Sequence, residues 1–184
     1  MKLFLNKFKY LVIFIFILIF FTLVFFWYIP NTNSAKNVVV DFDFKYYDVI
    51  CKGKLPNYDE LIKDPSFLNQ ISFRDKYYSL LYKKSNKKVP GLGIGNAWHQ
   101  TILLPNTCIL TAKSWVSKPS DPKPGLKYNR LTLLKKYNGQ WVIENDITSA
   151  NKISIFELFD KDKVMQKAKE YENKYNKLLK ESNN

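Results

Sequence analysis

The sequence has very little histidine and cysteine, the residues on which most metal sites and many catalytic sites depend. It contains one histidine and two cysteines in 184 residues, and no Cys-x-x-Cys pair. Because a structural zinc site needs four such ligands, we expect no metal site and no bound cofactor. The single histidine, His99, has no orienting partner that the sequence reveals, which favours a structural or surface role over acid–base catalysis.

A phosphate-binding loop is also missing. Gly91, Gly93 and Gly95 are spaced G-x-G-x-G, with no strand before them and no Lys-Ser/Thr pair after them. This spacing matches neither nucleotide-binding fingerprint and predicts a flexible turn that enters a sheet. Since no nucleophile–base pair can be read either, we expect a protein that is not an enzyme.

Arginine is scarce although the chain is strongly basic. The formal charge is +13, yet only Arg130 follows Arg74. The lysines are scattered and no RNP-like or zinc-finger pattern occurs, so nucleic acid is an unlikely partner. Three of the 29 basic residues and no acidic residue precede position 30, which leaves 26 basic against 16 acidic residues, or +10. Such a charge suits an anionic partner or acidic lipid headgroups.

Residues 10–29 form one long uncharged run, YLVIFIFILIFFTLVFFWYI. As a helix, 20 residues span roughly 30 Å, the thickness of a bilayer's hydrocarbon core. Lysines precede the run, and Tyr10, Trp27 and Tyr28 mark its ends. The run is longer than a signal-peptide core and no A-x-A site follows it, so we expect residues 1–29 to be an uncleaved single-pass anchor in the cytoplasmic (inner) membrane. The lysines favour a cytoplasmic amino end and an extracytoplasmic domain.

The two cysteines, Cys51 and Cys108, both follow the predicted anchor. In an oxidising compartment they are candidates for a disulfide, which closes a loop of about 57 residues and is worth roughly 4 kcal/mol in the chain-entropy model. Two buried, unbonded thiols are an equally good reading of the sequence.

The residues after the anchor predict helices first. Residues 30–37 are polar and predict a linker. Residues 38–50 fit both the two-residue period of a strand and the period of a helix, but Gly53, just past their end and between Lys52 and Lys54, favours a helix. A short helix capped by Asn57 is predicted over 58–63, and Ser72–Asp75 resembles a capping box that opens another helix.

Strands follow, at 98–104, 107–116, 126–137 and 140–147, with the proline-rich segment 117–125 predicted as a loop. Asn138-Gly139 predicts a two-residue turn of type I′. Counting outward from that turn pairs Lys136 with Trp141, Leu134 with Ile143, Thr132 with Asn145 and Arg130 with Ile147 on one face. Polar side chains in the middle of this face need partners, so we expect it to line a pocket or lie partly open. The predicted binding residues are Arg130, Thr132, Asn145 and Trp141.

Residues 151–184 predict a C-terminal amphipathic helix that opens with the capping box Ser154–Glu157 and runs to about Lys180. Apolar residues recur along it every three or four positions. The pattern favours packing on the helix's own domain, with self-association into a homo-oligomer as the alternative.

Two stretches resemble the NTF2-like (cystatin-like) superfamily. Residues 44–53 look like its first helix with a glycine stop, and residues 131–143 look like its last hairpin. The resemblance implies an α+β fold at 38–150, in which a curved antiparallel sheet wraps around helices and encloses a cone-shaped cavity. Anchored members are similar to VirB8-type assembly proteins or to NTF2-fold immunity proteins.

The function expected from these features is a membrane-anchored, extracytoplasmic protein-interaction domain, acting in envelope assembly, in secretion or as a toxin-immunity protein. Its expected partners are the bilayer, through residues 10–29, and another envelope or secreted protein. The alternative is an NTF2-like domain that binds a small molecule, or an enzyme with a polar-lined cavity. The acid–base groups available for the enzyme are Asp48, His99, Tyr46, Tyr47 and Arg130.

Overall fold

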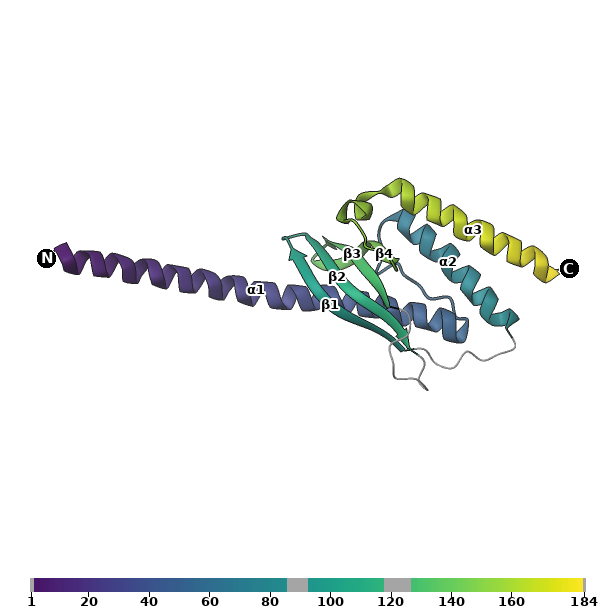
Figure 1. Cartoon of the computed structure of the whole chain (residues 1–184), viewed down its shortest axis with the longest axis horizontal. Helices are drawn as coiled ribbons and strands as arrows, with labels where there is room; N and C mark the ends of the chain where they lie inside the picture. Colours follow the sequence, from purple (N-terminus) through teal and green to yellow (C-terminus); the bar gives the residue numbers. More distant parts are fainter. Residues whose placement is uncertain (1, 86–92, 118–126, 184) are drawn as a thin grey trace. The chain divides into compact units, whose positions relative to one another are not determined.

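The computed structural model describes residues 2–85, 93–117 and 127–183. The chain divides into two compact units, Met1–Ser34 and Ala35–Asn184. The fold class is α+β, as predicted: a long apolar N-terminal helix, an open antiparallel sheet of four strands and a C-terminal helix (Figure 1). The predicted loop at 117–125, apart from Ser117, and the start of the glycine turn at Gly91 lie outside the described residues.

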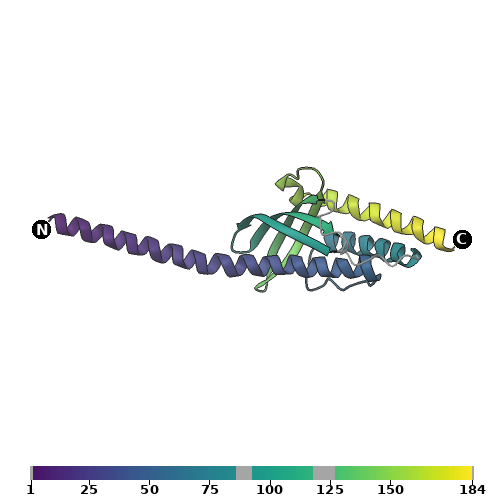
Figure 2. The same cartoon turned by 60° about the horizontal axis from the view of Figure 1, so that its bottom comes forward.

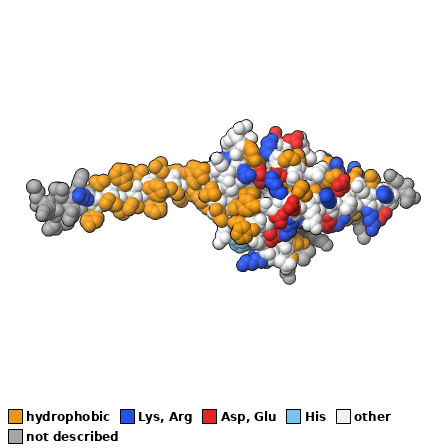
Figure 3. Space-filling model, turned by 90° about the horizontal axis from the view of Figure 1, so that it is seen from above, with side chains coloured by type: hydrophobic (Ala, Val, Ile, Leu, Met, Phe, Trp, Pro, Cys, Tyr) orange, Lys and Arg blue, Asp and Glu red, His pale blue; other side chains and the backbone are white. Residues whose placement is uncertain are grey.

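The first unit consists of helix α1, which runs from Lys2 to Lys52 and continues into the second unit. The large apolar side chains from Tyr10 to Ile29 are exposed, Tyr10 to 72% and Phe26 to 70%. Figure 3 shows hydrophobic side chains covering this part of the helix. Among the described residues this is the one helix long and apolar enough to cross a membrane.

Residues 30–37, predicted as a polar linker, are helical throughout, and the boundary between the two compact units, after Ser34, falls within them. Pro30 lies inside α1, where it removes one backbone donor. The side chain of Asn31 donates to the backbone carbonyl of Trp27 at 2.8 Å, which adds a hydrogen bond in this turn. Extending an existing helix is far easier than starting one, and Ala35 is fully buried in the core of the second unit. Polar composition alone therefore does not end the helix.

The end of α1 follows the prediction. The helix stops at Lys52, and Gly53 adopts a φ of 64°, a conformation that glycine reaches without strain. The Gly53 amide donates to the carbonyl of Val49 at 3.0 Å, and a Cβ at this position would lie 2.7 Å from the Tyr82 ring. Only glycine fits here.

The predicted short helix over 58–63 is a single turn instead. The Asn57 side chain accepts a hydrogen bond from the Asp59 amide at 2.7 Å, as a cap would. The turn goes no further because Ile62 forms a parallel bridge to Ile143, whose amide donates to the carbonyl of Leu61 at 2.7 Å.

Helix α2 runs from Pro65 to Lys84 and begins well before the predicted capping box at Ser72–Asp75, which lies inside it. Asp64 is its N-cap and accepts from the Phe67 amide at 3.0 Å. Proline is well suited to the first helical position, so Asp64-Pro65 outcompetes the weaker signal downstream.

The sheet contains β1 (Gly93–Leu103), β2 (Thr107–Ser117), β3 (Lys127–Tyr137) and β4 (Gln140–Ser149), in the order β1-β2-β3-β4. All neighbours are antiparallel. Asn138 and Gly139 both have positive φ, 50° and 82°, which confirms the predicted tight turn. One face of the sheet packs against helices, and the shared core contains Val39, Phe42, Phe67, Ile71, Leu110, Leu134 and Ile143.

A β-bulge changes the predicted register of the last hairpin. The pairs Lys136–Trp141 and Leu134–Ile143 form as predicted, but Leu133 then pairs with Asn145. Glu144 is the extra residue, and the side chains of β4 beyond it lie on the sheet face opposite to the one predicted. Thr132 consequently pairs with Asp146, and Arg130 with Thr148.

The C-terminal segment forms two helices rather than one. A short 3-10 helix, η1 (Ile155–Phe159), opens with the predicted capping box, in which the Ser154 amide donates to the Glu157 side chain at 2.9 Å. The chain leaves the helical conformation at Asp160, and α3 then runs from Lys161 to Asn183. Helices α2 and α3 lie side by side (Figure 2). The predicted apolar stripe of α3 thus packs within its own domain, with Val164 and Ala168 buried.

Candidate functional site

A cavity of about 450 Å³ lies inside the second unit, between the sheet and the three helices. This volume is in the range of small-molecule sites, roughly 300–1,000 Å³. Aromatic rings make up much of its wall, among them Tyr46, Tyr78, Trp115, Tyr128 and Tyr171. The chain's only two arginines, Arg74 and Arg130, both line it. The two guanidinium groups are in very different states.

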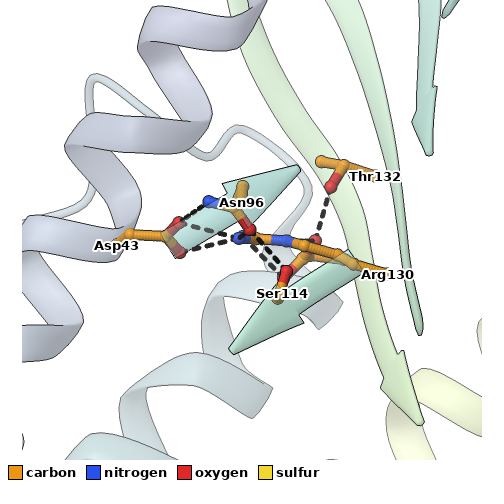
Figure 4. A network of polar contacts seen from close by, with 6 residues as sticks. Asp43, Asn96, Ser114, Arg130 and Thr132 are labelled. Atoms are coloured by element: carbon orange, nitrogen blue, oxygen red, sulfur yellow. Dashed lines mark hydrogen bonds and ion pairs between the residues drawn. The ribbon is translucent and has the colours of Figure 1, made fainter. Parts of the chain in front are cut away.

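Arg130, on β3, is fully paired. Its Nη1 donates to Asp43 of α1 at 2.8 and 2.9 Å, and its Nε and Nη2 donate to Asp146 of β4 at 2.8 and 3.1 Å. Asn96 of β1 accepts from Nη1 at 3.2 Å, donates to Asp43 at 2.7 Å and accepts from the Ser114 hydroxyl of β2. Figure 4 shows these side chains converging from the helix and the strands. The cluster therefore ties α1 to all four strands.

The Arg130 cluster is structural in character because its guanidinium is buried and paired with two carboxylates. Only 3% of the Arg130 side chain is exposed. Burial by itself disfavours the charged form, but the carboxylates of Asp146 and Asp43 outweigh it and raise the pKa of Arg130 above its ordinary value. A doubly paired buried arginine is held in one geometry.

Arg74, on α2, is only partly paired. Its Nε donates to Asp75 at 2.8 Å, and its guanidinium lies 4.0 Å from the centre of the Tyr46 ring and 5.4 Å from that of Phe42. Its Nη2 is buried and has no hydrogen-bond partner among the described residues. Burial opposes the charge, and Asp75 and the tyrosines Tyr46 and Tyr58 outweigh it, so the pKa of Arg74 is raised. A charged donor thus remains unused at the cavity wall.

Gln70 lies one helical turn before Arg74, on the same face of α2. The residue is 6% exposed, lines the cavity, and its Oε1 has no partner among the described residues. Leaving a buried polar atom unpaired typically costs about 1–3 kcal/mol. An unpaired donor and an unpaired acceptor therefore stand on adjacent turns of α2, both buried, in two residues that line the cavity.

The charges at the cavity wall balance. Three lining side chains are cationic and three are anionic: Arg74, Arg130 and Lys167 against Asp43, Asp146 and Glu170. Since burial raises the pKa of Tyr46 and of Tyr171, these phenols stay protonated at neutral pH. The six charged side chains of the wall thus sum to zero. Within the described residues, no group of three or more His, Cys, Asp or Glu side chains could hold a metal ion.

The four predicted binding residues do not form one surface. Arg130 and Thr132 come together on Asp146, to which the Thr132 hydroxyl donates at 2.6 Å. The bulge turns Asn145 to the opposite face, where its side chain donates to the carbonyl of Leu158 in η1 at 2.9 Å. Trp141 lies in the main core, with the Lys136 ammonium 4.9 Å from its ring centre. All four are buried, at most 4% exposed, which removes them as an exposed contact.

Cys51 and Cys108 are both buried and unbonded, so the predicted disulfide is absent and the alternative of two free thiols holds. Cys108 packs in the same core cluster as Ala35 near the start of the second unit. Cys51 lies 16 residues further along α1, roughly 24 Å away along the helix axis, well beyond the distance a disulfide spans. Burial raises the pKa of the Cys108 thiol to about 11.

His99 is exposed and is the extra residue of a bulge in β1, between Trp98 and Gln100. This agrees with the predicted surface role.

Two residues of the cavity, Gln70 and Arg74, were not among the predicted site residues. A signal for them exists in the sequence, because Phe67, Ile71 and Tyr78 recur at helical spacing. Gln70 and Arg74 fall within that apolar stripe, and polar residues at such positions mark a site or a buried network.

No protein-family model matches the chain, and no curated protein matches it. Among solved structures, it is similar to the crystal structure of a domain of unknown function with a cystatin-like fold from Nostoc punctiforme. The two share 13% sequence identity and superpose with a TM-score of 0.33, over 48% of this chain and 54% of the other. The chain therefore spans about half the length of this weak structural neighbour.

Proposed function

We propose that this chain is a membrane-anchored binding protein whose domain takes a small, uncharged, amide-bearing molecule into the cavity between sheet and helices. The observation that carries the proposal is the pair of unused polar atoms, the Nη2 of Arg74 and the Oε1 of Gln70. A carboxamide carries an acceptor and a donor on neighbouring atoms, which is the combination that these two atoms call for. The arrangement of one antiparallel sheet, helices over one face and a cavity between them is also the one that an NTF2-like domain implies.

Binding without turnover is the simplest use of this cavity. The two lining aspartates, Asp43 and Asp146, are held by Arg130 and are poorly placed to act as a base. Tyr46 has a raised pKa and is a poor proton acceptor at neutral pH. The third lining carboxylate, Glu170, is ion-paired with Lys174 at 2.6 Å, so each lining carboxylate already has a cationic partner.

The anchor part of the proposal places residues 10–29 across the cytoplasmic membrane with the amino end inside. The exposed apolar surface of this part of α1 supports it. In carbonate-washed membranes the full-length chain should stay in the pellet, and a reporter fused after Asn184 should be active only outside the cytoplasm. A shortened soluble product, or a reporter active inside, would contradict this topology.

The ligand part is tested with three planar probes of one size: benzamide, benzoate and benzylamine. Binding to the full chain in nanodiscs is followed by saturation-transfer NMR, with empty nanodiscs as the blank. We expect benzamide to bind at least tenfold more tightly than either charged analogue, a difference of about 1.4 kcal/mol. Gln70→Leu should remove most of this preference, and Gln100→Leu, at an exposed position outside the cavity, is the matched control. No binding of benzamide, or equal binding of all three probes, would overturn the proposal.

A further inference from the structure

The two edges of the sheet differ. At the β4 edge, Ile62 bridges to Ile143 and the Ile143 amide is bonded to Leu61. At the other edge, β1 pairs with β2 on one side and with no strand on its other side among the described residues. β1 is 11 residues long and contains no Lys, Asp, Glu or Pro, the residues that usually protect such an edge.

A groove of about 520 Å³ runs beside this open edge. One wall is a stripe of α1, Val40, Phe44 and Tyr47, which recur at helical spacing next to the residues that α1 buries in the core. The other wall is formed by alternate residues of β1, Ile94, Asn96 and Trp98. Phe44 is 67% exposed although Phe42, two positions before it, is buried in the core. The apolar surface of α1 thus extends further than the sheet covers.

An extended chain fits both features at once. A strand added beside β1 would satisfy its outer amides and carbonyls, and would place every second side chain on the face where Ile94 and Trp98 lie. Those side chains would cover the α1 stripe. A small molecule could fill the groove but would leave the edge unpaired, and a helix cannot pair with it.

The length of the site follows from the bulge at His99. A bulge interrupts regular pairing, so the usable edge is the part from Gly93 to Trp98, next to the groove. At about 3.3 Å per residue this is roughly 20 Å, enough for a strand of about six residues.

We infer that this edge and the α1 stripe dock an extended segment of a partner protein, apolar at alternate positions and flanked by acidic residues. β1 carries no charged residue, so the part of the segment that pairs with it needs none. The chain beyond the anchor run has a net charge of +10, which favours acidic residues on either side of that part. The groove shares Asp43 and Ile94 with the cavity wall, whereas Val40, Phe44, Tyr47 and Trp98 line the groove and not the cavity.

The inference is tested with a display library of random 12-residue peptides, selected on the full chain in nanodiscs. Enriched peptides should be apolar at every second position, and Phe44→Asp should weaken the best of them at least tenfold. Ile102→Asp is the matched control, because Ile102 is also an exposed residue of β1 (47%) but lies outside the groove.

The peptide itself supplies a second test that needs no protein variant. Two versions of the best peptide are compared, one N-methylated at its odd positions and one at its even positions. Only one of these two sets of amides faces β1, so one version should lose binding and the other should bind unchanged. Enrichment without a two-residue period, or equal tolerance of both methylation phases, overturns the inference. A third result would also overturn it: no peptide is enriched, and analytical ultracentrifugation shows a dimer that Phe44→Asp dissociates. The groove would then be occupied by a second copy of this chain.

Discussion

Replacing Gln70 by leucine should stabilise the ligand-free protein. Gln70 is 6% exposed and its Oε1 is unpaired, so the free protein carries the penalty of a buried unsatisfied acceptor, about 1–3 kcal/mol. Leucine has nearly the same size and removes that penalty. For a domain of about 150 residues, each kcal/mol changes Tm by roughly 2–4 °C, so we expect Tm to rise by about 2–12 °C.

Asn145→Leu is the matched control with the opposite sign. Asn145 is 4% exposed, but its amide is used, donating to the carbonyl of Leu158 at 2.9 Å. Leucine there leaves that carbonyl unpaired and should lower the stability by about 1–3 kcal/mol. The two substitutions are chemically alike, so a general effect of added apolar surface would shift both the same way.

The assay is thermal and urea unfolding of the full chain in nanodiscs, followed by tryptophan fluorescence. Adding benzamide at 100 times its Kd should stabilise the wild type by about 2.7 kcal/mol and Gln70→Leu by much less. The difference in free energy of unfolding between the two proteins should therefore shrink or change sign. If Gln70→Leu lowers the free energy of unfolding by 1 kcal/mol or more without ligand, the Oε1 is satisfied in the native protein and the reasoning fails.

Two further predictions concern stability. Arg130→Met leaves Asp43 and Asp146 buried without their cation and should lower the free energy of unfolding by about 3–5 kcal/mol. Scanning fluorimetry should then show a fall in Tm of roughly 6–20 °C. A loss below 1 kcal/mol would show that the cluster does not hold α1 to the sheet. Burial opposes ionisation of Asp64, but the hydrogen bonds that it accepts from the Phe67 amide and Lys161 prevail and lower its pKa. The stabilisation by ionised Asp64 is therefore fully present above the unfolded pKa of about 4 and is lost as pH falls through the lower folded pKa. Asp64→Asn should keep the cap at neutral pH and flatten the stability curve in that acid window, and an unchanged curve would assign the acid loss to other carboxylates.

Local signals predicted the ends of elements well where one residue type decides the backbone. Gly53 ends α1 and Asn138-Gly139 turns the hairpin because both need positive φ, which the sequence states directly. Competing signals were harder to rank. The prediction started this helix at Ser72–Asp75, whereas α2 begins at the Asp64 cap and Pro65, and its earlier turns bury Phe67 and Ile71 in the core.

The candidate site could be predicted only in part because one bulge reverses the faces of β4. Counting in twos from the turn is correct as far as Ile143 and wrong beyond it, since Glu144 is skipped in the pairing. That single residue separates Asn145 from Thr132 and gives Arg130 the neighbour Asp146. The remaining partner of Arg130, Asp43, is 87 positions away, and sequence spacing carries no information on such a contact.

That separation also has a consequence for how the protein is made. Translation proceeds at about 5–20 residues per second, so Arg130 is synthesised roughly 4–17 s after Asp43. During this interval Tyr58 and Phe67 are available to pack on Phe42, but the carboxylate of Asp43 has no Arg130 to hold it against a sheet. The apolar contacts of the first helix can therefore form before the ion pair that ties this helix to the third strand.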